Sequence, residues 1–387
     1  MQTYIFSKRG YCNFFWVLYF FISDLSKFLD DFGISRVISY VIFILFMCVY
    51  LYIERQRITP VDVLIQLFFA IIAVYGLLNN AEYIEDKKRV YAIIINFIPA
   101  YYLFRMASFE SMNHGLKYAA FLSGLYMVYS YVTEVHGASG YDMNYDMNYS
   151  RGCALPSCVM FYYFVHERKY LFLVLSLFLF ATSFLAGSRS APMLTLMCFI
   201  IFILAKMKKS KLGVLSIASF FSFLVVVWFK LEWILIDVLG LESSRNVAKF
   251  VSGQYMVSHD REELYNEIIV HLSANPTGYG PLGSRRILNL GGYPHSLYYE
   301  LQLDFGIYLG IALFVLFMVM AAYLVFVYYD DELAPLVIPL CVVGLGVLMV
   351  STSYYHDYTV PAIVALFIRL IFVERKKLSG FPKMLKL

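Results

Sequence analysis

The sequence predicts an all-α, polytopic integral membrane protein, and three observations carry this prediction. Hydrophobic residues make up 61% of the 387 residues and charged residues only 15%, against about 25% charged residues in soluble domains. Apolar runs such as 41–53 and 313–329 are too long and too uncharged for a solvated surface. The first apolar run, from Tyr11, lacks a small-residue cleavage site and is expected to be a span rather than a signal peptide. The net charge of +4 does not indicate nucleic-acid binding.

Apolar runs long enough to cross a bilayer recur along the chain and predict about twelve transmembrane helices. Lysine and arginine are enriched in the loops of one side, which include 206–211 and the tail after 373, and such loops are typically cytoplasmic. This pattern places both termini in the cytoplasm, with 87–89 as the one strongly basic loop on the opposite side. The predicted spans are 11–29, 36–53, 60–78, 90–107, 117–135, 152–165, 170–187, 190–205, 212–232, 296–328, 336–353 and 358–373.

The predicted spans divide the chain into three parts. Residues 1–232 hold nine spans, residues 233–295 form one large extracytoplasmic loop, and residues 296–387 hold three spans and a basic tail. A smaller polar outer loop near 136–151 contains a tandem YDMN repeat. A plain connector explains this repeat about as well as a sugar-contacting loop does.

The large loop is far longer than the 2–8 residues that usually connect bundle helices, and its sequence indicates internal order. Asp260 with Glu263 gives a capping-box pattern at the start of a helix. Three apolar residues then recur four apart, at Leu264, Ile268 and Leu272. We expect a short amphipathic helix on the membrane surface or the bundle mouth. The run NPTGYGPLG (275–283) predicts turns, so the loop is expected to be a structured lid.

Four arginines are candidates for binding an anion. Arg189 lies between two predicted spans with almost no loop, where a charge costs roughly 2.5–3.5 kcal/mol and usually faces a cavity and a partner. Arg261 begins the predicted amphipathic helix and alone would be an ordinary solvated charge. Arg285 and Arg286 follow the GPLG turn, where guanidinium groups and backbone amides can together hold an anion. A patch that binds lipid headgroups explains either of these two equally well.

A histidine follows a proline at the start of the tenth span, at His295. Histidine titrates near neutrality and is suited to general acid–base chemistry, although a helix-capping or interfacial histidine is the plainer reading of this residue alone. Tyr298 and Tyr299 would share its helix face, whereas Glu300 points about 140° away and is a candidate to orient an arginine. No HxxxH or HExxH spacing occurs, so we expect no metal site.

The six cysteines form no CxxC pair and mostly lie inside apolar runs. We expect them to be small packing residues. The 34 tyrosines and 35 phenylalanines are better explained by interfacial belts and helix packing than by stacking on sugar rings.

Three segments together resemble a known superfamily. They are SRSAPM (188–193), DREELYNEIIVHLSANPTGYG (260–280) and PHSLYYELQLDFGIYLG (294–310). In this order they resemble the O-antigen polymerase and O-antigen ligase superfamily of bacterial surface-polysaccharide enzymes, the Wzy-like polymerases and their ligase relatives. The resemblance covers roughly the second half of the chain. Ser296 stands where the superfamily usually has asparagine after the histidine, and Arg285 and Arg286 have no clear counterpart.

The resemblance implies a glycosyltransferase of the bacterial inner membrane with its active site facing the periplasm. Such enzymes transfer glycan from an undecaprenyl-pyrophosphate carrier to an acceptor sugar without a cofactor, and their fold is a helical bundle similar to that of the C-type glycosyltransferases. By carry-over, Arg189 and Arg261 bind the donor pyrophosphate and His295 acts near the acceptor hydroxyl. Further expected contacts to pyrophosphate or sugar are Arg285, Arg286, Tyr279, Tyr298, Tyr299 and Glu300. The implied partners are the lipid-linked oligosaccharide, membrane lipids and a chain-length regulator protein, with no nucleic acid.

Three activities fit these expectations. A polymerase that joins lipid-linked repeat units is favoured, because the tyrosine-rich, weakly charged chain has a second polar outer loop. A ligase that moves finished polymer onto lipid A–core is the rival within the class. A flippase for the same lipid-linked saccharide is the alternative from another class. Such transporters often have repeated halves with broken helices at the midplane, whereas this chain has one large outer loop and its candidate charges lie at one predicted face of the membrane.

Overall fold

The computed structural model is helical in every regular element of the residues it describes. The described residues are 14–21, 25, 27, 29, 36–54, 58–80, 87–106, 109–135, 147–185, 190–207, 236–237, 252, 260–288, 294–350, 353–354 and 357–373. Arg189, the predicted span 212–232 and most of the YDMN repeat lie outside them. The chain forms two compact units, of which the first comprises Met1–Cys48, Phe109–Val257 and Tyr328–Val343. The second comprises Val49–Ser108, Ser258–Val327 and Gly344–Leu387.

In the first unit, α7 (Met147–Glu167) is the central helix of the described residues. It packs against α6 (Phe109–Ser130), α8 (Tyr170–Leu185), α9 (Ser190–Met207) and α16 (Ala334–Pro339). Small polar residues join α7 to α8: Ser150 and Ser183 each donate a hydrogen bond to the other's backbone carbonyl over 2.8 Å. Ser157 and Ser176 repeat this arrangement one heptad away, at 2.9 and 2.8 Å. Such reciprocal contacts between small residues allow close helix packing in lipid.

The second unit contains α4 (Pro60–Asn80), α5 (Lys87–Met106) and α18 (Thr359–Phe372), together with the segments that carry most of the candidate residues. α5 packs against both α4 and α18. A buried ion pair joins the first two helices, because Arg105 Nε lies 2.9 Å from Asp62 Oδ1, and Tyr101 donates a hydrogen bond to the same oxygen at 2.8 Å. Thr59 donates its backbone N–H and its hydroxyl to the other carboxylate oxygen of Asp62, which caps the start of α4.

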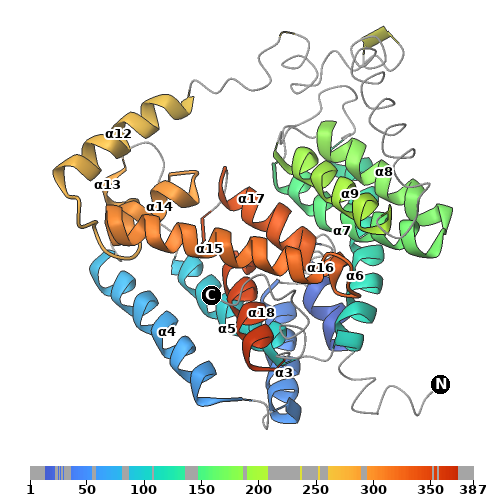
Figure 1. Cartoon of the computed structure of the whole chain (residues 1–387), viewed down its shortest axis with the longest axis horizontal. Coiled ribbons are helices and arrows are strands. Elements are labelled where there is room, and N and C mark those ends of the chain that lie inside the picture. Colours follow the sequence, from blue (N-terminus) through green and yellow to red (C-terminus); the bar gives the residue numbers. More distant parts are fainter. Residues whose placement is uncertain are drawn as a thin grey trace, which may run out of the picture. The chain divides into compact units, whose positions relative to one another are not determined.

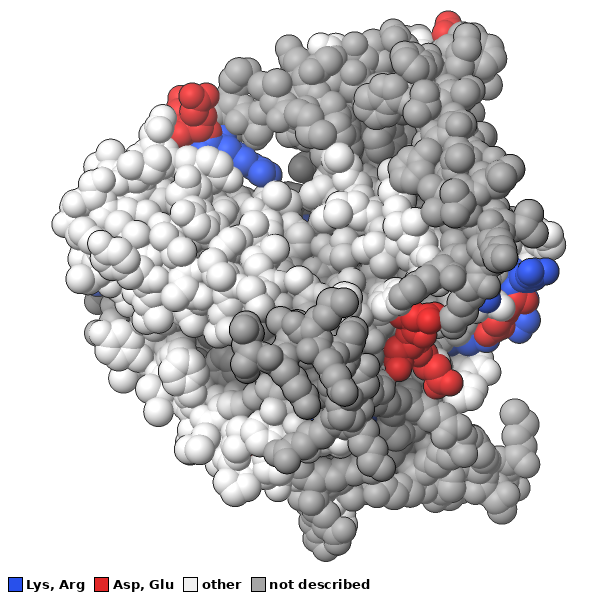
Figure 2. Space-filling model, in the orientation of Figure 1, with Lys and Arg blue, Asp and Glu red and all other residues white. Residues whose placement is uncertain are grey.

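Among the described residues, α15 (Ile307–Tyr328) is long and apolar enough to cross a membrane. Only 22% of its most apolar window is buried, so most of its side chains face outward, as lipid contact would require. Shorter apolar helices run along 41–50, 60–76, 170–185, 190–206, 334–348 and 359–372. The surface visible in Figure 2 is almost entirely uncharged where it is described. The total of twelve spans stays a prediction.

The predicted tenth span, 296–328, is wrong as one continuous helix. The structure has α14 (Leu297–Phe305) and α15 as separate helices divided at Gly306, which has φ 85°. The interruption follows from packing, because a β-carbon at Gly306 would lie 2.7 Å from the carbonyl oxygen of Thr277. With nine residues, α14 is only about 13.5 Å long and is too short to cross a hydrocarbon core of about 30 Å.

Two other predicted boundaries also differ. The predicted short span 152–165 is extended to α7, Met147–Glu167, with Pro156 inside the helix. The predicted span 336–353 begins earlier and is irregular: α16 is followed by a π-helical turn, Leu340–Gly344, and by α17, Leu345–Leu348. Pro339 at the end of α16 lacks a backbone N–H, which accounts for the change in helical hydrogen bonding there.

Candidate functional site

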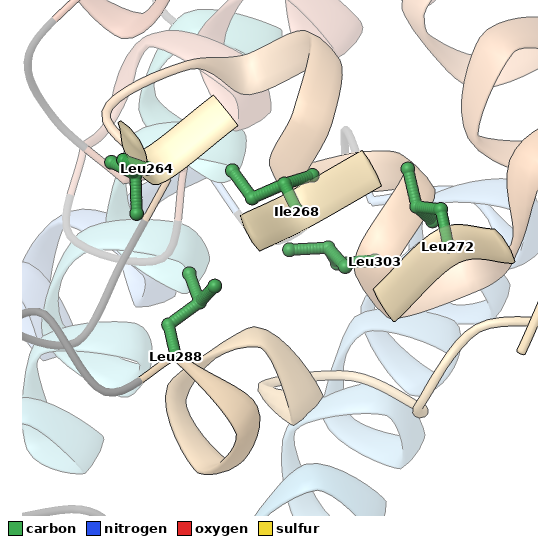
Figure 3. Packing of buried hydrophobic residues seen from close by; sticks show 5 residues of the cluster. All are labelled: Leu264, Ile268, Leu272, Leu288 and Leu303. Atoms are coloured by element: carbon green, nitrogen blue, oxygen red, sulfur yellow. The ribbon is translucent and has the colours of Figure 1, made fainter. Parts of the chain in front are cut away.

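The predicted amphipathic helix is confirmed as α12 (Asp260–Ala274), which packs against α14. Its three apolar residues, Leu264, Ile268 and Leu272, are buried together with Leu288 and Leu303 (Figure 3). Burying each such side chain contributes about 1.5–3 kcal/mol, so this cluster holds α12 in place. Arg261 is partly exposed in the first turn of the helix. Charged side chains gather at this end of α12, next to otherwise uncharged surface (Figure 2).

The turn NPTGYG (275–280) follows α12 and is joined to the break between α14 and α15. Asn275 Nδ2 donates a hydrogen bond to the Gly278 carbonyl at 2.7 Å, which closes the turn. The backbone N–H of Tyr279 donates to the Leu303 carbonyl at 2.7 Å, and that of Ile307 donates to the Pro276 carbonyl at 3.0 Å. A β-carbon on Gly278, which has φ 83°, would lie 2.3 Å from the Gly306 nitrogen. The turn and the break therefore require glycine on both sides of their contact.

The two adjacent arginines lie on α13 (Gly283–Ile287), a short helix that packs against α4 and α14. Arg285 is partly exposed and Arg286 is exposed. Gly76 of α4 allows the close approach, because a β-carbon there would lie 2.9 Å from the Pro281 carbonyl oxygen. α12, α13 and α14 thus form one cluster in the second unit (Figure 1), and it contains every described candidate residue.

His295 lies two residues before α14, and Ser296 occupies the N-cap position without a side-chain capping hydrogen bond. Its φ of 52° places it in the left-handed region, which is strained for a residue with a β-carbon and is often found at functional sites. Tyr298 contacts the ring of Phe314 at 5.3 Å between centroids, and Tyr299 contacts that of Tyr265 at 4.9 Å. Both tyrosines stay partly exposed.

Two buried carboxylates lie one turn apart on α14, at Glu300 and Asp304. Glu300 accepts hydrogen bonds from the Ser353 hydroxyl and, at 3.4 Å, from the Tyr354 backbone N–H. Burial, followed by the charge of Asp304, raises the pKa of Glu300 from 4.5 to about 8. Burial likewise raises the pKa of Asp304 from 3.8 to about 6, although hydrogen bonds that it accepts lower it. Burial therefore favours the protonated form of Glu300 more strongly than that of Asp304, whose carboxylate accepts three hydrogen bonds.

The sequence prediction missed Asp304, Ser353 and Tyr354. The sequence did contain a signal for the pair Glu300 and Asp304. Two carboxylates spaced i, i+4 inside an apolar segment share one helix face, so they are either buried side by side or exposed together. The partners at 353–354 are fifty residues away along the chain. Helical periodicity does not reach across such a distance.

An apolar cavity of about 140 Å³ lies within the second unit. Its walls come from α4, α5, α14, α15 and α18 and from Leu282 and Tyr354. Two lining residues, Phe68 and Leu309, are more than half exposed, so the cavity borders the outer surface of α4 and α15. A cavity of this size and lining can hold an apolar molecule about as large as benzene.

Within the described residues, no group of three or more His, Cys, Asp or Glu side chains is arranged to hold a metal ion. Independence from metals stays a prediction. The described candidates suited to binding an anion are Arg261, Arg285 and Arg286, and the described candidate for proton transfer is His295.

Comparison with known proteins gives a match to a family model over part of the chain. Residues 171–315 match a protein-family model described as O-Antigen ligase, and this range runs from α8 through α12, α13 and α14 into α15. It therefore includes all the candidate residues named above. A search of curated proteins found no match. The family match over residues 171–315 supports the resemblance of this part of the chain to the O-antigen ligase and polymerase superfamily.

Proposed function

We propose that the protein is a surface-polysaccharide polymerase that joins undecaprenyl-pyrophosphate-linked repeat units at the periplasmic face of the inner membrane. The family match supports a polysaccharide polymerase or ligase role. The observation that carries the proposal is that Arg261, Arg285, Arg286 and His295 lie on or directly beside α12, α13 and α14, where α12 and α13 both pack against α14 within one unit. Guanidinium groups bind pyrophosphate oxygens, and a histidine transfers a proton near neutral pH.

In the proposed reaction the acceptor sugar hydroxyl attacks the anomeric carbon of the donor glycan. The new C–O bond forms as the bond from that carbon to the pyrophosphate oxygen breaks, and undecaprenyl pyrophosphate leaves. His295 takes the proton of the attacking hydroxyl. Arg189 and Arg261, aided by Arg285 and Arg286, stabilise the negative charge that collects on the leaving pyrophosphate.

The apolar cavity is the proposed place for part of the donor's lipid tail. Leu282, which lines this cavity, is three residues from Arg285 along the chain. A lipid pyrophosphate has the same order of parts, a doubly charged head directly followed by an isoprenoid chain. We therefore place the pyrophosphate at α13 and the first isoprene units in the cavity.

The second candidate is an O-antigen ligase, which uses the same donor chemistry and differs in its acceptor. The description of the matching family itself favours this activity. In the ligase reading the acceptor hydroxyl belongs to lipid A–core, and the roles of the arginines and His295 are unchanged.

A lipopolysaccharide gel from a strain lacking this protein distinguishes the activities. For a polymerase we expect core carrying a single repeat and no ladder, because ligation still works. Bare core with long polymer left on its lipid carrier would instead identify a ligase. Single repeats stranded on the cytoplasmic side would indicate a flippase and contradict both proposals. Complementation with the wild-type protein, compared with Arg261→Ala at equal protein level, would link the phenotype to the site.

A further inference from the structure

Two buried carboxylates connect the arginine-bearing helix to the helix that begins after His295. Glu300 and Asp304 are 0% and 2% exposed. We therefore do not place either carboxyl group in direct contact with the lipid-linked substrate. A buried carboxylate is costly unless hydrogen-bond donors satisfy it. Segments far apart in sequence supply these donors, so the two acids act as connectors.

Asp304 holds the start of α13. Its Oδ1 accepts the backbone N–H of Ser284 at 3.1 Å, and its Oδ2 accepts that of Leu282 at 3.2 Å. The Tyr354 hydroxyl donates to Oδ2 at 2.8 Å. Leu282 has a left-handed φ of 65°, a conformation that needs surrounding contacts to persist. The carboxylate of Asp304 therefore fixes the turn from which Arg285 and Arg286 project.

Glu300 extends this connection to the segment 353–354 through Ser353 and the Tyr354 backbone. The positive charge of Arg285 lowers the pKa of both Glu300 and Tyr354, so this arginine lies within electrostatic range of these two groups. Two segments, 282–284 and 353–354, thus meet at the side of α14, and His295 lies two residues before the first residue of this helix. The same helix sets the place of the histidine and of the arginine pair.

We propose that Asp304 and Glu300 are positioning residues, which hold Arg285 and Arg286 at a fixed place relative to the helix that follows His295. This inference rests on the proposed function, in which a pyrophosphate must meet the arginines and the histidine together. Neutralising Asp304 leaves every arginine present but weakens the contact that fixes α13. The variants Asp304→Asn and Tyr354→Phe test this, since the second removes one hydroxyl and keeps the ring in the cavity wall.

The first measurement is a distance and does not depend on activity. Nitroxide labels at Arg286→Cys and Tyr308→Cys, in a background of Cys12→Ser and Cys48→Ser, report the position of α13 relative to α15 by double electron–electron resonance. We expect one narrow distance distribution in the parent and a distribution at least twice as wide with Asp304→Asn or Tyr354→Phe. The matched control is Asp331→Asn, because Asp331 Oδ1 also accepts a backbone N–H, that of Leu333 at 3.0 Å, but in the other unit. An unchanged distribution in both test variants would overturn the proposal.

The second measurement is the affinity of the unlabelled full-length protein for farnesyl pyrophosphate, with farnesol as the probe lacking the charged head. We expect Asp304→Asn to raise the dissociation constant at least ten-fold and Tyr354→Phe several-fold, with Asp331→Asn equal to the wild type and farnesol unaffected. Broadened distances with unchanged affinity would overturn the positioning role. A different result is that the wild type binds farnesyl pyrophosphate and farnesol equally while Asp304→Asn still broadens the distance distribution between α13 and α15. That result would support the role of Asp304 in holding α13 and would contradict the proposed pyrophosphate site.

Discussion

His295 combines an ionisable side chain with a backbone conformation that most residues avoid. Its φ of 52° costs a residue with a β-carbon about 1–2 kcal/mol, and asparagine tolerates this region better than most residues do. His295→Asn therefore keeps a polar side chain and an acceptable backbone but removes the imidazole that would accept the proton. If His295 transfers the proton, turnover should fall about 100-fold or more. Polymer length on gels and turnover of purified protein measure this.

As controls, the amount of His295→Asn protein in cells and its thermal stability should both equal those of the wild type. His295→Ala should also abolish polymer, with some loss of stability from the same strained backbone. Long polymer in cells that contain only His295→Asn would remove the histidine from the mechanism.

Glu300 makes the stability of the protein depend on pH. Its pKa is about 8 in the folded protein and 4.5 ordinarily, so between these values the folded state keeps a proton that the unfolded state has released. Stability must then decrease as pH rises through this window. From pH 6 to 9 we expect the wild type to lose about 1–3 kcal/mol through this group. Glu300→Gln cannot titrate and should show a smaller loss.

Thermal unfolding in detergent across this pH range measures the difference between the two proteins. Asp304 contributes in the same direction but at lower pH, because its pKa is about 6. Equal pH dependence in the wild type and Glu300→Gln would show that Glu300 is not protonated in the folded protein at neutrality.

At the scale of elements, the site depends on backbone contact between the NPTGYG turn and the break at Gly306. Gly306→Ala would place a β-carbon 2.7 Å from the Thr277 carbonyl oxygen at a φ of 85°. Neither backbone can move aside without breaking the Tyr279–Leu303 and Ile307–Pro276 hydrogen bonds. We expect Gly306→Ala to lower stability by more than about 1 kcal/mol and to abolish polymer.

The comparison variant is Thr277→Ala, which loses only a side-chain hydrogen bond to Asn275. It should keep near-normal stability and polymer. If Gly306→Ala behaves like Thr277→Ala in thermal unfolding, the break does not require glycine.

These elements show which features local sequence can predict. Leu264, Ile268 and Leu272 recur at helical spacing, and they do pack on one face of α12. The break at Gly306 was missed because a single glycine within a long run of residues does not by itself predict a break, and only the contact with Thr277 makes the glycine necessary. Asp304 was missed for a related reason. Its partners Leu282 and Tyr354 are twenty-two and fifty residues away, and no local pattern encodes such pairings.

At the scale of the whole molecule, the candidate residues are unevenly distributed between the units. Arg261, Arg285, Arg286 and His295 belong to the second unit, whereas Arg189 falls in the sequence range of the first. The family match begins in the first unit and ends in the second. In the described part of the first unit, serine contacts join α7 to α8. The second combines the polar cluster, the buried acids and the apolar cavity.

The walls of the apolar cavity come from five helices of the second unit. A change in the cavity wall therefore tests whether this unit as a whole binds the isoprenoid tail of the donor. Leu313 of α15 lines it, whereas Leu316 of the same helix is half exposed and does not. Leu313→Trp should fill space that an isoprenoid chain would occupy. We expect it to lower turnover several-fold with an undecaprenyl-linked donor, mainly through a higher KM, because tail binding contributes to affinity in proportion to the apolar area buried. Leu316→Trp, with the same added indole, should leave the KM unchanged.

A further comparison uses a donor whose tail has only two or three isoprene units and measures its KM with the wild type and with Leu313→Trp. Loss of tail contacts should already have weakened the binding of this donor to the wild type, so Leu313→Trp should affect its KM less than it affects that of the long-tailed donor. Equal KM values for Leu313→Trp, Leu316→Trp and the wild type with the undecaprenyl-linked donor would mean that the tail lies elsewhere. The arginines of α13 would then have to bind a pyrophosphate whose chain leaves the site in another direction, and the order of head and tail proposed here would be wrong.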